Sequence, residues 1–138
     1  MEARKDEAVA YFAKGYNCCQ AVALPYCEEF GISKEAMYKL GEGFGTGIGG
    51  LRDTCGAVMG MFFILSLANS AGNMEKPLET KLDTYEKFRE AAVKFQEENG
   101  SIYCRDLKFP TDRKPVSCFK CVEDAAALVD EYLAKLGY

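Results

Sequence analysis

Residues 55–68 read CGAVMGMFFILSLA, a stretch near the middle of the chain that contains no charged side chain. Its apolar residues fall on every side of a helix with about 3.6 residues per turn, so such a helix must be covered by protein all round. The uncharged run continues to Met74. Only about a dozen of its positions are strongly apolar, fewer than the roughly 20 that a membrane span needs. We therefore expect the buried central helix of a soluble protein that does not insert into a membrane.

Apolar residues three or four positions apart indicate amphipathic helices on both sides of this segment. They predict helices over residues 3–14, 17–30, 34–40 and 77–99, and a last helix that follows Ser117. Asn17 and Ser33 are favourable N-cap residues, and Pro25 should kink the second helix because proline lacks an amide donor. No segment alternates polar and apolar residues as a strand does. The sequence predicts one all-α domain over residues 1–138, a compact helical bundle around the buried central helix.

The sequence also predicts the caps of two further helices and the core-facing residues of the long helix. We expect Asp53 or Thr54 to cap the central helix and Ser101 to cap the next short helical turn. In the long helix that follows Pro77, Leu78 and Leu82 begin the apolar stripe that should face the core.

Six glycines lie within residues 41–50, GEGFGTGIGG, a short distance before the central helix. Such a composition predicts a turn-rich loop or a close approach of the backbone to another part of the protein. The loop formally contains G-x-G-x-x-G, but no strand precedes it, so we do not expect it to bind a dinucleotide. We expect the loop to pass close to Cys55, with Gly45, Gly47 and Gly56 as the backbone positions next to a bound cofactor.

The composition narrows the classes of function. The net charge of −4 and the lack of a large basic cluster argue against binding to nucleic acid. The chain begins with charged residues and has no apolar signal segment, so we expect a cytoplasmic protein, and a bundle of this size could form a homodimer. The absence of histidine excludes histidine-based catalysis. Seven cysteines are typical, in a reducing compartment, of metal or redox sites.

Four cysteines share one predicted setting, the first turn of a helix: Cys18, Cys55, Cys104 and Cys118. There, free amide groups and the positive end of the helix dipole stabilise a thiolate, the form that attacks disulfides and binds metals. Cys118 also forms a C-x-x-C with Cys121, which is a weak signal without a βαβ pattern around it. Cys19 points away from its neighbour Cys18 on a helix, and we expect Cys27 in the core.

Five motifs are distinctive in combination. They are Asn17-Cys18 with Gln20-Ala21-Val22, the Gly-Phe-Gly loop, Thr54-Cys55-Gly56-Ala57-Val58-x-Gly60, Cys104-Arg105, and Cys118 with Val122-x-Asp124-Ala125-Ala126. Together they resemble the C_GCAxxG_C_C family of redox-active proteins over nearly the whole chain. One departure is that the family pattern has glycine before cysteine, whereas here Cys55 precedes Gly56. The family is similar to a domain of the split-Soret cytochromes, which are associated with an iron–sulfur centre.

The resemblance implies a functional set of four cysteines, Cys18, Cys55, Cys104 and Cys118, whereas Cys19, Cys27 and Cys121 are additions in this chain. It leaves three functions open, of which we favour the first. The four cysteines would bind an iron–sulfur cluster, without haem, for electron transfer with a redox partner protein or for redox sensing. A metal-free thiol–disulfide protein would instead use Cys55 as the catalytic nucleophile and one of the other three as the resolving thiol. A structural or binding domain would hold zinc with the same four residues, or no metal.

Overall fold

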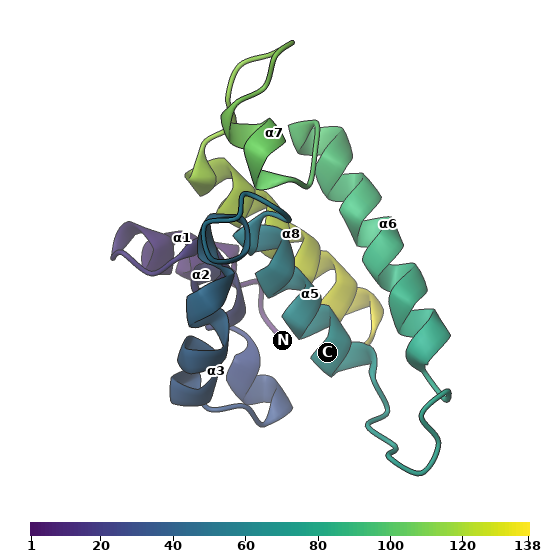
Figure 1. Cartoon of the computed structure of the whole chain (residues 1–138). Coiled ribbons are helices and arrows are strands. Elements are labelled where there is room, and N and C mark those ends of the chain that lie inside the picture. The colour runs from purple at the N-terminus through teal and green to yellow at the C-terminus, as the bar shows by residue number, and fades with distance from the viewer.

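Helix α5 (Gly56–Asn69) runs through the middle of the computed structural model, which describes all 138 residues (Figure 1). No residue of α5 is exposed, and Val58, Met61 and Ile64 are completely buried. Helices α2 (Cys18–Ala23) and α8 (Cys118–Lys135) pack against it. The prediction of an all-α protein around a buried central helix is therefore confirmed. None of the helices combines the length and the apolar character that a membrane crossing requires.

The remaining elements surround these three helices. They are α1 (Lys5–Ala13), the 3-10 helix η1 (Cys27–Phe30), α3 (Lys34–Gly41), the 3-10 helix η2 (Glu42–Phe44), α4 (Gly45–Ile48), α6 (Lys81–Asn99) and α7 (Cys104–Lys108). Helix α1 packs on α2 and α8, α3 packs on α2, and α6 covers α5 and α8. In Figure 1 the long helix α6 lies on one side of the bundle, and α1, α2 and α3 lie on the other.

The predicted caps of two early helices are confirmed. Asn17 forms a capping box with Gln20, in which the Asn17 side-chain oxygen accepts the Gln20 amide at 2.8 Å. The hydroxyl of Ser33 accepts the amide of Ala36 at 3.0 Å, which begins α3. Each cap satisfies an amide that the first turn of a helix leaves without a partner.

The second helix is shorter than predicted, because Pro25 interrupts it rather than kinking it. Helix α2 ends at Ala23, and the chain continues through a turn into η1, which ends at the left-handed Gly31. Proline lacks the amide that would continue the hydrogen-bond ladder, and its ring clashes with the preceding turn. The prediction of one continuous helix over residues 17–30 was wrong in this respect.

The long helix starts later than predicted. It begins at Lys81, so Leu78 lies before it and is 70% exposed, and Leu82 in its first turn is 68% exposed. The inward face is set further along the helix by Ala91 and Phe95, which are completely buried. The first turn of α6 extends beyond the end of the core, so apolar spacing alone assigned these two leucines to the wrong environment.

The expected caps of the central helix and of the short helix α7 were also wrong. Cys55 itself is the N-cap residue of α5, and Tyr103 rather than Ser101 precedes α7. The reason is a single antiparallel bridge between Thr54 and Tyr103, which keeps both segments extended before their helices begin. The Ser101 hydroxyl accepts the amide of Tyr103 instead of capping a helix.

Candidate cysteine site

Four cysteines from distant parts of the chain line one cavity of about 290 Å³. Cys18, Cys104 and Cys118 are the first residues of α2, α7 and α8, and Cys55 immediately precedes α5. The starts of α5, α7 and α8 lie together towards the top of Figure 1. The fold thus brings together the four cysteines that sequence reasoning selected.

The backbone bridge between residues 54 and 103 places Cys55 beside Cys104. The Cys55 amide donates to the carbonyl of Ile102 at 2.7 Å, and the Cys104 amide donates to the carbonyl of Asp53 at 2.7 Å. Side chains alternate along extended backbone, and residues opposite each other in an antiparallel pair point to the same face. The neighbours of the bridge residues therefore share one face, so Cys55 and Cys104 both reach the cavity.

The glycine-rich segment closes over the start of α2, next to Cys18. The side-chain nitrogen of Asn17 donates to the carbonyls of Gly41 at 3.1 Å and Glu42 at 3.0 Å. Gly45 approaches the same side chain so closely that a Cβ at position 45 would lie 2.8 Å from the Asn17 Cβ. The prediction of a close backbone approach in this loop is confirmed.

The same loop then forms a left-handed turn at α4. Three consecutive residues have positive φ angles of 52°, 66° and 67°, namely Thr46, Gly47 and Ile48. Left-handed backbone costs about 1–2 kcal/mol for a residue with a side chain, so other contacts must hold the turn. The amides of Arg52 and Asp53 donate to the carbonyls of Thr46 and Gly47 at 3.3 and 2.9 Å. A Cβ at Gly47 would lie 2.6 Å from the Cys104 Cβ, so only glycine fits against the start of α7.

A cap and a backbone contact place Cys118. The hydroxyl of Ser117 accepts the amide of Lys120 at 3.1 Å and begins α8, as predicted. One residue earlier, the amide of Val116 donates to the carbonyl of Leu107 at 2.9 Å. This bond fixes the start of α8 against α7, so that both helices contribute to one cavity wall.

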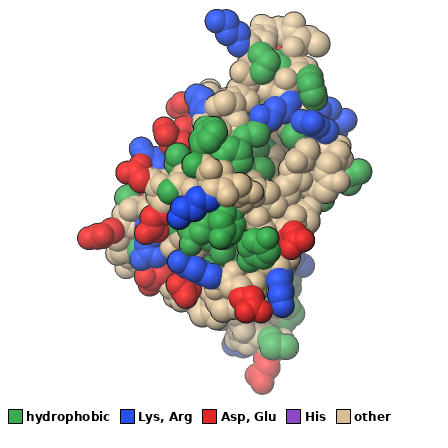
Figure 2. Space-filling model, turned by 90° about the vertical axis from the view of Figure 1, so that its left-hand side faces the viewer, with side chains coloured by type: hydrophobic (Ala, Val, Ile, Leu, Met, Phe, Trp, Pro, Cys, Tyr) green, Lys and Arg blue, Asp and Glu red, His purple; other side chains and the backbone are tan.

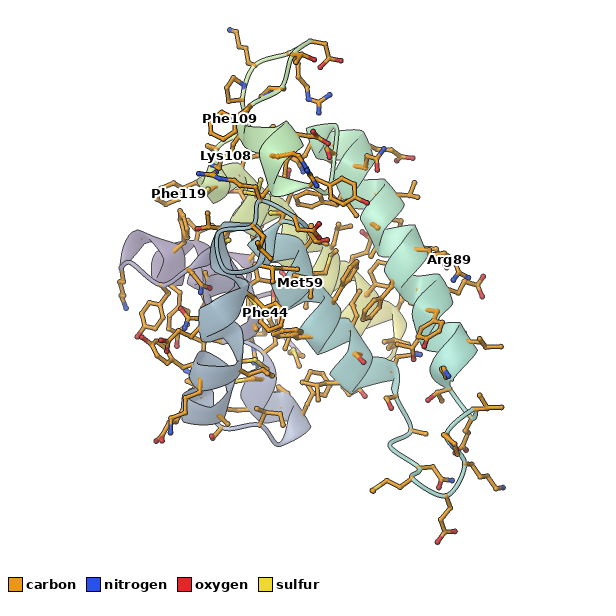
Figure 3. The ribbon with its side chains drawn as sticks, in the orientation of Figure 1. Phe44, Met59, Arg89, Lys108, Phe109 and Phe119 are labelled. Atoms are coloured by element: carbon orange, nitrogen blue, oxygen red, sulfur yellow. The ribbon has the colours of Figure 1, made fainter.

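Two basic side chains line the cavity, and no acidic side chain does. Arg52 Nη1 lies 3.8 Å from Cys104 Sγ, and the guanidinium lies 5.0 Å from the centre of the Phe109 ring. The pKa of Lys108 is raised above its ordinary value. Burial alone would lower this pKa, but the hydrogen bond to Cys118 and the charges of nearby thiols outweigh burial. Lys108 lies next to Phe109 in Figure 3. The cavity wall therefore carries positive charge close to two of the four sulfurs.

Burial governs the acid–base behaviour of the other two thiols. Burial, reinforced by the charge of Cys55, raises the pKa of Cys18 from 9.0 to about 11, although the Thr46 amide hydrogen-bonds its sulfur. A hydrogen bond to the Cys121 thiol, together with burial, raises the pKa of Cys55 well above 9.0. Helix-start amides do lower the pKa of both thiols, through Cys18 itself and through Ala57 and Val58 beside Cys55, but burial and the neighbouring thiols outweigh them. Both carry a proton at neutral pH.

The metal-free, reduced protein should therefore lose stability at alkaline pH. Cys18 loses its proton near pH 9.0 in the unfolded chain but only at about 11 in the folded protein. The folded state binds the Cys18 proton more tightly than the unfolded chain does. The resulting stabilisation is fully present below pH 9.0 and is lost as the pH rises to about 11. Cys18 should account for about 2 kcal/mol of the loss in the free energy of unfolding, measured with urea, and the raised pKa values of Cys19 and Cys55 add to the total. The Cys18→Ala variant should lose less of its free energy of unfolding between about pH 9 and 11 than the wild type does. An equal loss in the two proteins would contradict the role assigned to the Cys18 thiol.

A fifth cysteine faces the same cavity. Cys121 lies one turn after Cys118 on α8, lines the cavity and is 2% exposed. The C-x-x-C spacing signalled this position, because residues three apart share one face of a helix. Cys19 is completely buried and is not part of the cavity wall, and Cys27 lies in the core as expected. All seven cysteines are free thiols.

The glycines predicted to lie near a cofactor divide into two groups. Gly47 and Gly56 belong to the cavity wall, whereas Gly45 does not. A Cβ at Gly56 would collide with Cys18 Sγ and would lie 2.7 Å from the Phe44 carbonyl oxygen. Position 56 therefore has no room for a side chain, and Cys55, which precedes this glycine, lines the cavity.

The spread of the sulfurs limits what the cavity can hold. No three cysteine, aspartate or glutamate side chains are grouped so that they could hold one metal ion. A four-sulfur zinc site requires every sulfur to lie about 2.3 Å from a single point. The side chains of this structure are therefore not arranged as a site for a single metal ion.

These features define an all-helical protein in which four of the seven cysteines stand at the starts of four helices around one cavity lined by two basic side chains. The family model described as "Putative redox-active protein (C_GCAxxG_C_C)" matches residues 16–132, and the chain belongs to this family. An uncharacterized protein of Archaeoglobus fulgidus is 28% identical to it over 142 residues, which cover 98% of this chain and 94% of the relative. No solved structure matches the chain.

Proposed function

We propose that the cavity binds an iron–sulfur cluster through Cys18, Cys55, Cys104 and Cys118, and that the protein transfers electrons or senses redox state. The observation that carries this proposal is the convergence of four thiols on one cavity that no acidic side chain lines. Four cysteine thiolates are the ordinary ligands of [2Fe–2S] and [4Fe–4S] clusters. When bound, such a cluster would supply one-electron oxidation and reduction.

The protonation of the thiols supports a metal centre over a metal-free nucleophile. The pKa of Cys18 is raised to about 11, and that of Cys55 is also raised. A nucleophilic cysteine acts as a thiolate, so it needs a pKa near or below neutral pH. Metal ions, in contrast, displace protons from cysteines as they bind. Cys55 is therefore better suited to bind metal than to attack a disulfide unaided.

The charges on the cavity wall also suit a cluster. A cluster with four thiolate ligands carries net negative charge, and Arg52 and Lys108 lie on the cavity wall where they would balance it. Gly47 and Gly56, which have no side chains, would let the backbone approach the bound centre. Backbone amides at such positions donate hydrogen bonds to cluster sulfurs and tune the reduction potential.

A redox titration of the anaerobically purified protein tests the proposal. Visible absorption should bleach and recover with a one-electron midpoint, and the absence of any reversible change would overturn the assignment. Lys108→Met should lower the midpoint by roughly 1 kcal/mol, or on the order of 40 mV, because a positive charge stabilises the reduced state. Lys120→Met is the matched control, since Lys120 pairs with Asp124 at 2.6 Å and is not part of the cavity wall. Equal midpoints in both variants would contradict the role of Lys108.

The surface around the cavity suits an acidic redox partner protein. Residues 103–121 carry five of the 17 basic residues and two of the 21 acidic ones, a net charge of +3 in a chain of net charge −4. Phe109 and Phe119 are 68% and 49% exposed and lie near Lys108 in Figure 3. In Figure 2 the upper right of the face carries Lys, Arg and hydrophobic side chains, while most acidic side chains lie to the left and below. A homodimer remains a separate prediction.

A further inference from the structure

We propose that the protein pairs with a second copy of itself through an apolar groove beside helix α5, which receives Met74 from a loop of the partner copy. Each copy offers one groove and one loop, so the pair contains two identical, reciprocal contacts. Neither the groove nor the loop at residues 70–80 contains a cysteine or belongs to the cysteine cavity. The inference therefore stands apart from the proposed function.

The groove, here called the α5 groove, is a hollow of about 440 Å³ without any charged side chain in its walls. Its apolar walls are formed by Ile32, Met37, Leu40, Phe63 and Leu67. Helix α5 is apolar on all sides, yet Phe63 and Leu67 are only partly buried within one chain. Because a helix of this composition needs protein around its whole circumference, the α5 groove is where that cover is incomplete.

One apolar side chain lies almost fully in solvent close to this groove. The loop at residues 70–80 joins α5 to α6, and its residues Ser70 and Gly72 themselves line the groove. Met74 follows two residues later and is 96% exposed, the largest exposure of any large apolar side chain in the protein. The protein thus carries an apolar projection directly beside an apolar hollow.

Hydrogen bonds within the loop hold this projection in place. The side-chain oxygen of Asn73 accepts the amide of Glu75, and the carbonyl of Asn73 accepts the amide of Lys76, both at 3.1 Å. Met74 therefore lies at the tip of a closed turn. A side chain presented on a preformed turn loses less conformational freedom on binding than one on an open loop.

A second copy is the partner that uses both features. The groove and the loop adjoin in the lower part of Figure 1, so a two-fold axis between them places each loop opposite the groove of the other copy. The groove and residues 70–74 carry no charge, so two identical surfaces meet without like-charge repulsion. The flexible side chain of methionine also suits an irregular apolar groove.

The available surface fits a weak but specific pair. Leu40 at the groove, and Met74 and Leu78 on the loop, are 54%, 96% and 70% exposed. Burial of three such side chains removes roughly 300 Å² of apolar surface from water on each copy. With the surfaces that they cover, the pair buries on the order of 1,000 Å², the lower limit for a biological interface. We therefore expect a reversible dimer that forms as the protein concentration rises.

The pairing leaves both cysteine cavities open. The α5 groove lies along the second half of α5, whereas the cavity lies at the start of this helix. Each copy can therefore meet a redox partner at one end while it binds the second copy at the other.

Sedimentation velocity over a series of protein concentrations tests the inference. The full chain is kept metal-free and reduced with dithiothreitol, so that neither a cluster nor a disulfide contributes to association. We expect a monomer–dimer equilibrium whose dissociation constant hardly changes with added salt, because no charged side chain lines the groove. A monomer at every concentration, assemblies larger than a dimer, or association that salt weakens steeply would overturn the inference.

A substitution in the loop tests the contact itself. Met74→Lys should weaken association by roughly tenfold or more, because the introduced charge would lose its hydration in an apolar groove. Met74 is 96% exposed, so the variant should keep the wild-type fold, which circular dichroism checks. Leu51→Lys is the matched control, since Leu51 is 74% exposed and belongs to neither the groove nor the loop, and it should associate as the wild type does. Equal association of the two variants would refute the contact.

A mixture of two variants tests whether the contacts are reciprocal. Leu40→Glu should weaken association in the same way as Met74→Lys. The mixture should associate again, because opposite charges then meet at one contact and wild-type residues meet at the other. A mixture that stays monomeric would overturn the two-fold arrangement. Both variants should load iron as the wild type does, and a protein that dimerises but binds no iron would support this inference while refuting the cluster proposal.

Discussion

Replacement of Cys104 with serine should reduce iron binding by on the order of tenfold or more. Cys104 is 6% exposed, lines the cavity and is held beside Cys55 by the backbone bridge at residues 54 and 103. A serine hydroxyl is a hard, weakly acidic ligand that replaces a thiolate poorly on iron. The measurement is iron per protein after anaerobic loading, with circular dichroism to confirm the fold.

The matched control for this variant is Cys27→Ser, which removes a thiol from the core away from the cavity. It should retain the iron content of the wild type, although its stability will fall somewhat. The same loss of iron as in Cys104→Ser is expected for Cys18→Ser, Cys55→Ser and Cys118→Ser. Full iron binding by Cys104→Ser would remove this residue from the ligand set.

The second large effect is expected for Gly56→Ala. An added Cβ would collide with Cys18 Sγ and would lie 2.7 Å from the Phe44 carbonyl oxygen, so both the sulfur and the backbone at residue 44 would have to shift. Overpacking of this kind costs about 1–3 kcal/mol, and here it would also displace a proposed ligand. We expect a lower free energy of unfolding, measured with urea, together with reduced iron loading.

Gly43→Ala provides the control for Gly56→Ala. A Cβ at position 43 meets no heavy atom within 4 Å, and Gly43 does not have a positive φ angle. Its stability and iron content should therefore match those of the wild type. If Gly56→Ala behaved in the same way as Gly43→Ala, the close packing of α5 on the cysteine cavity would be refuted.

Much of the fold could be predicted from local signals in the sequence. The segment at residues 55–68 is apolar on all sides and has too few strongly apolar positions for a membrane span, so it indicates a helix at the centre of a protein. Asn17 and Ser117 are caps whose hydrogen bonds are local, so they also located Cys18 and Cys118 at the starts of their helices. These predictions succeeded because the residues that decide them are close together in the chain.

The remaining features depend on contacts between distant residues. The bridge between Thr54 and Tyr103 shifted two predicted caps, and no local pattern announces a pairing across 49 positions. The left-handed turn at Gly47 is stable only because residues 52 and 53 hold it. The raised pKa of Cys18 results from burial by the assembled fold. A helix start was therefore a good guide to where the cysteines lie but a poor guide to their protonation.

The central claim is that four cysteines bind an iron–sulfur cluster in one cavity. The most direct test is to purify the wild-type protein without oxygen and to measure iron, acid-labile sulfide and zinc against protein in the same sample. The claim predicts iron and sulfide in nearly equal molar amounts, with little zinc. Stoichiometric zinc without sulfide, or no metal together with freely reactive cysteines at the cavity, would contradict it.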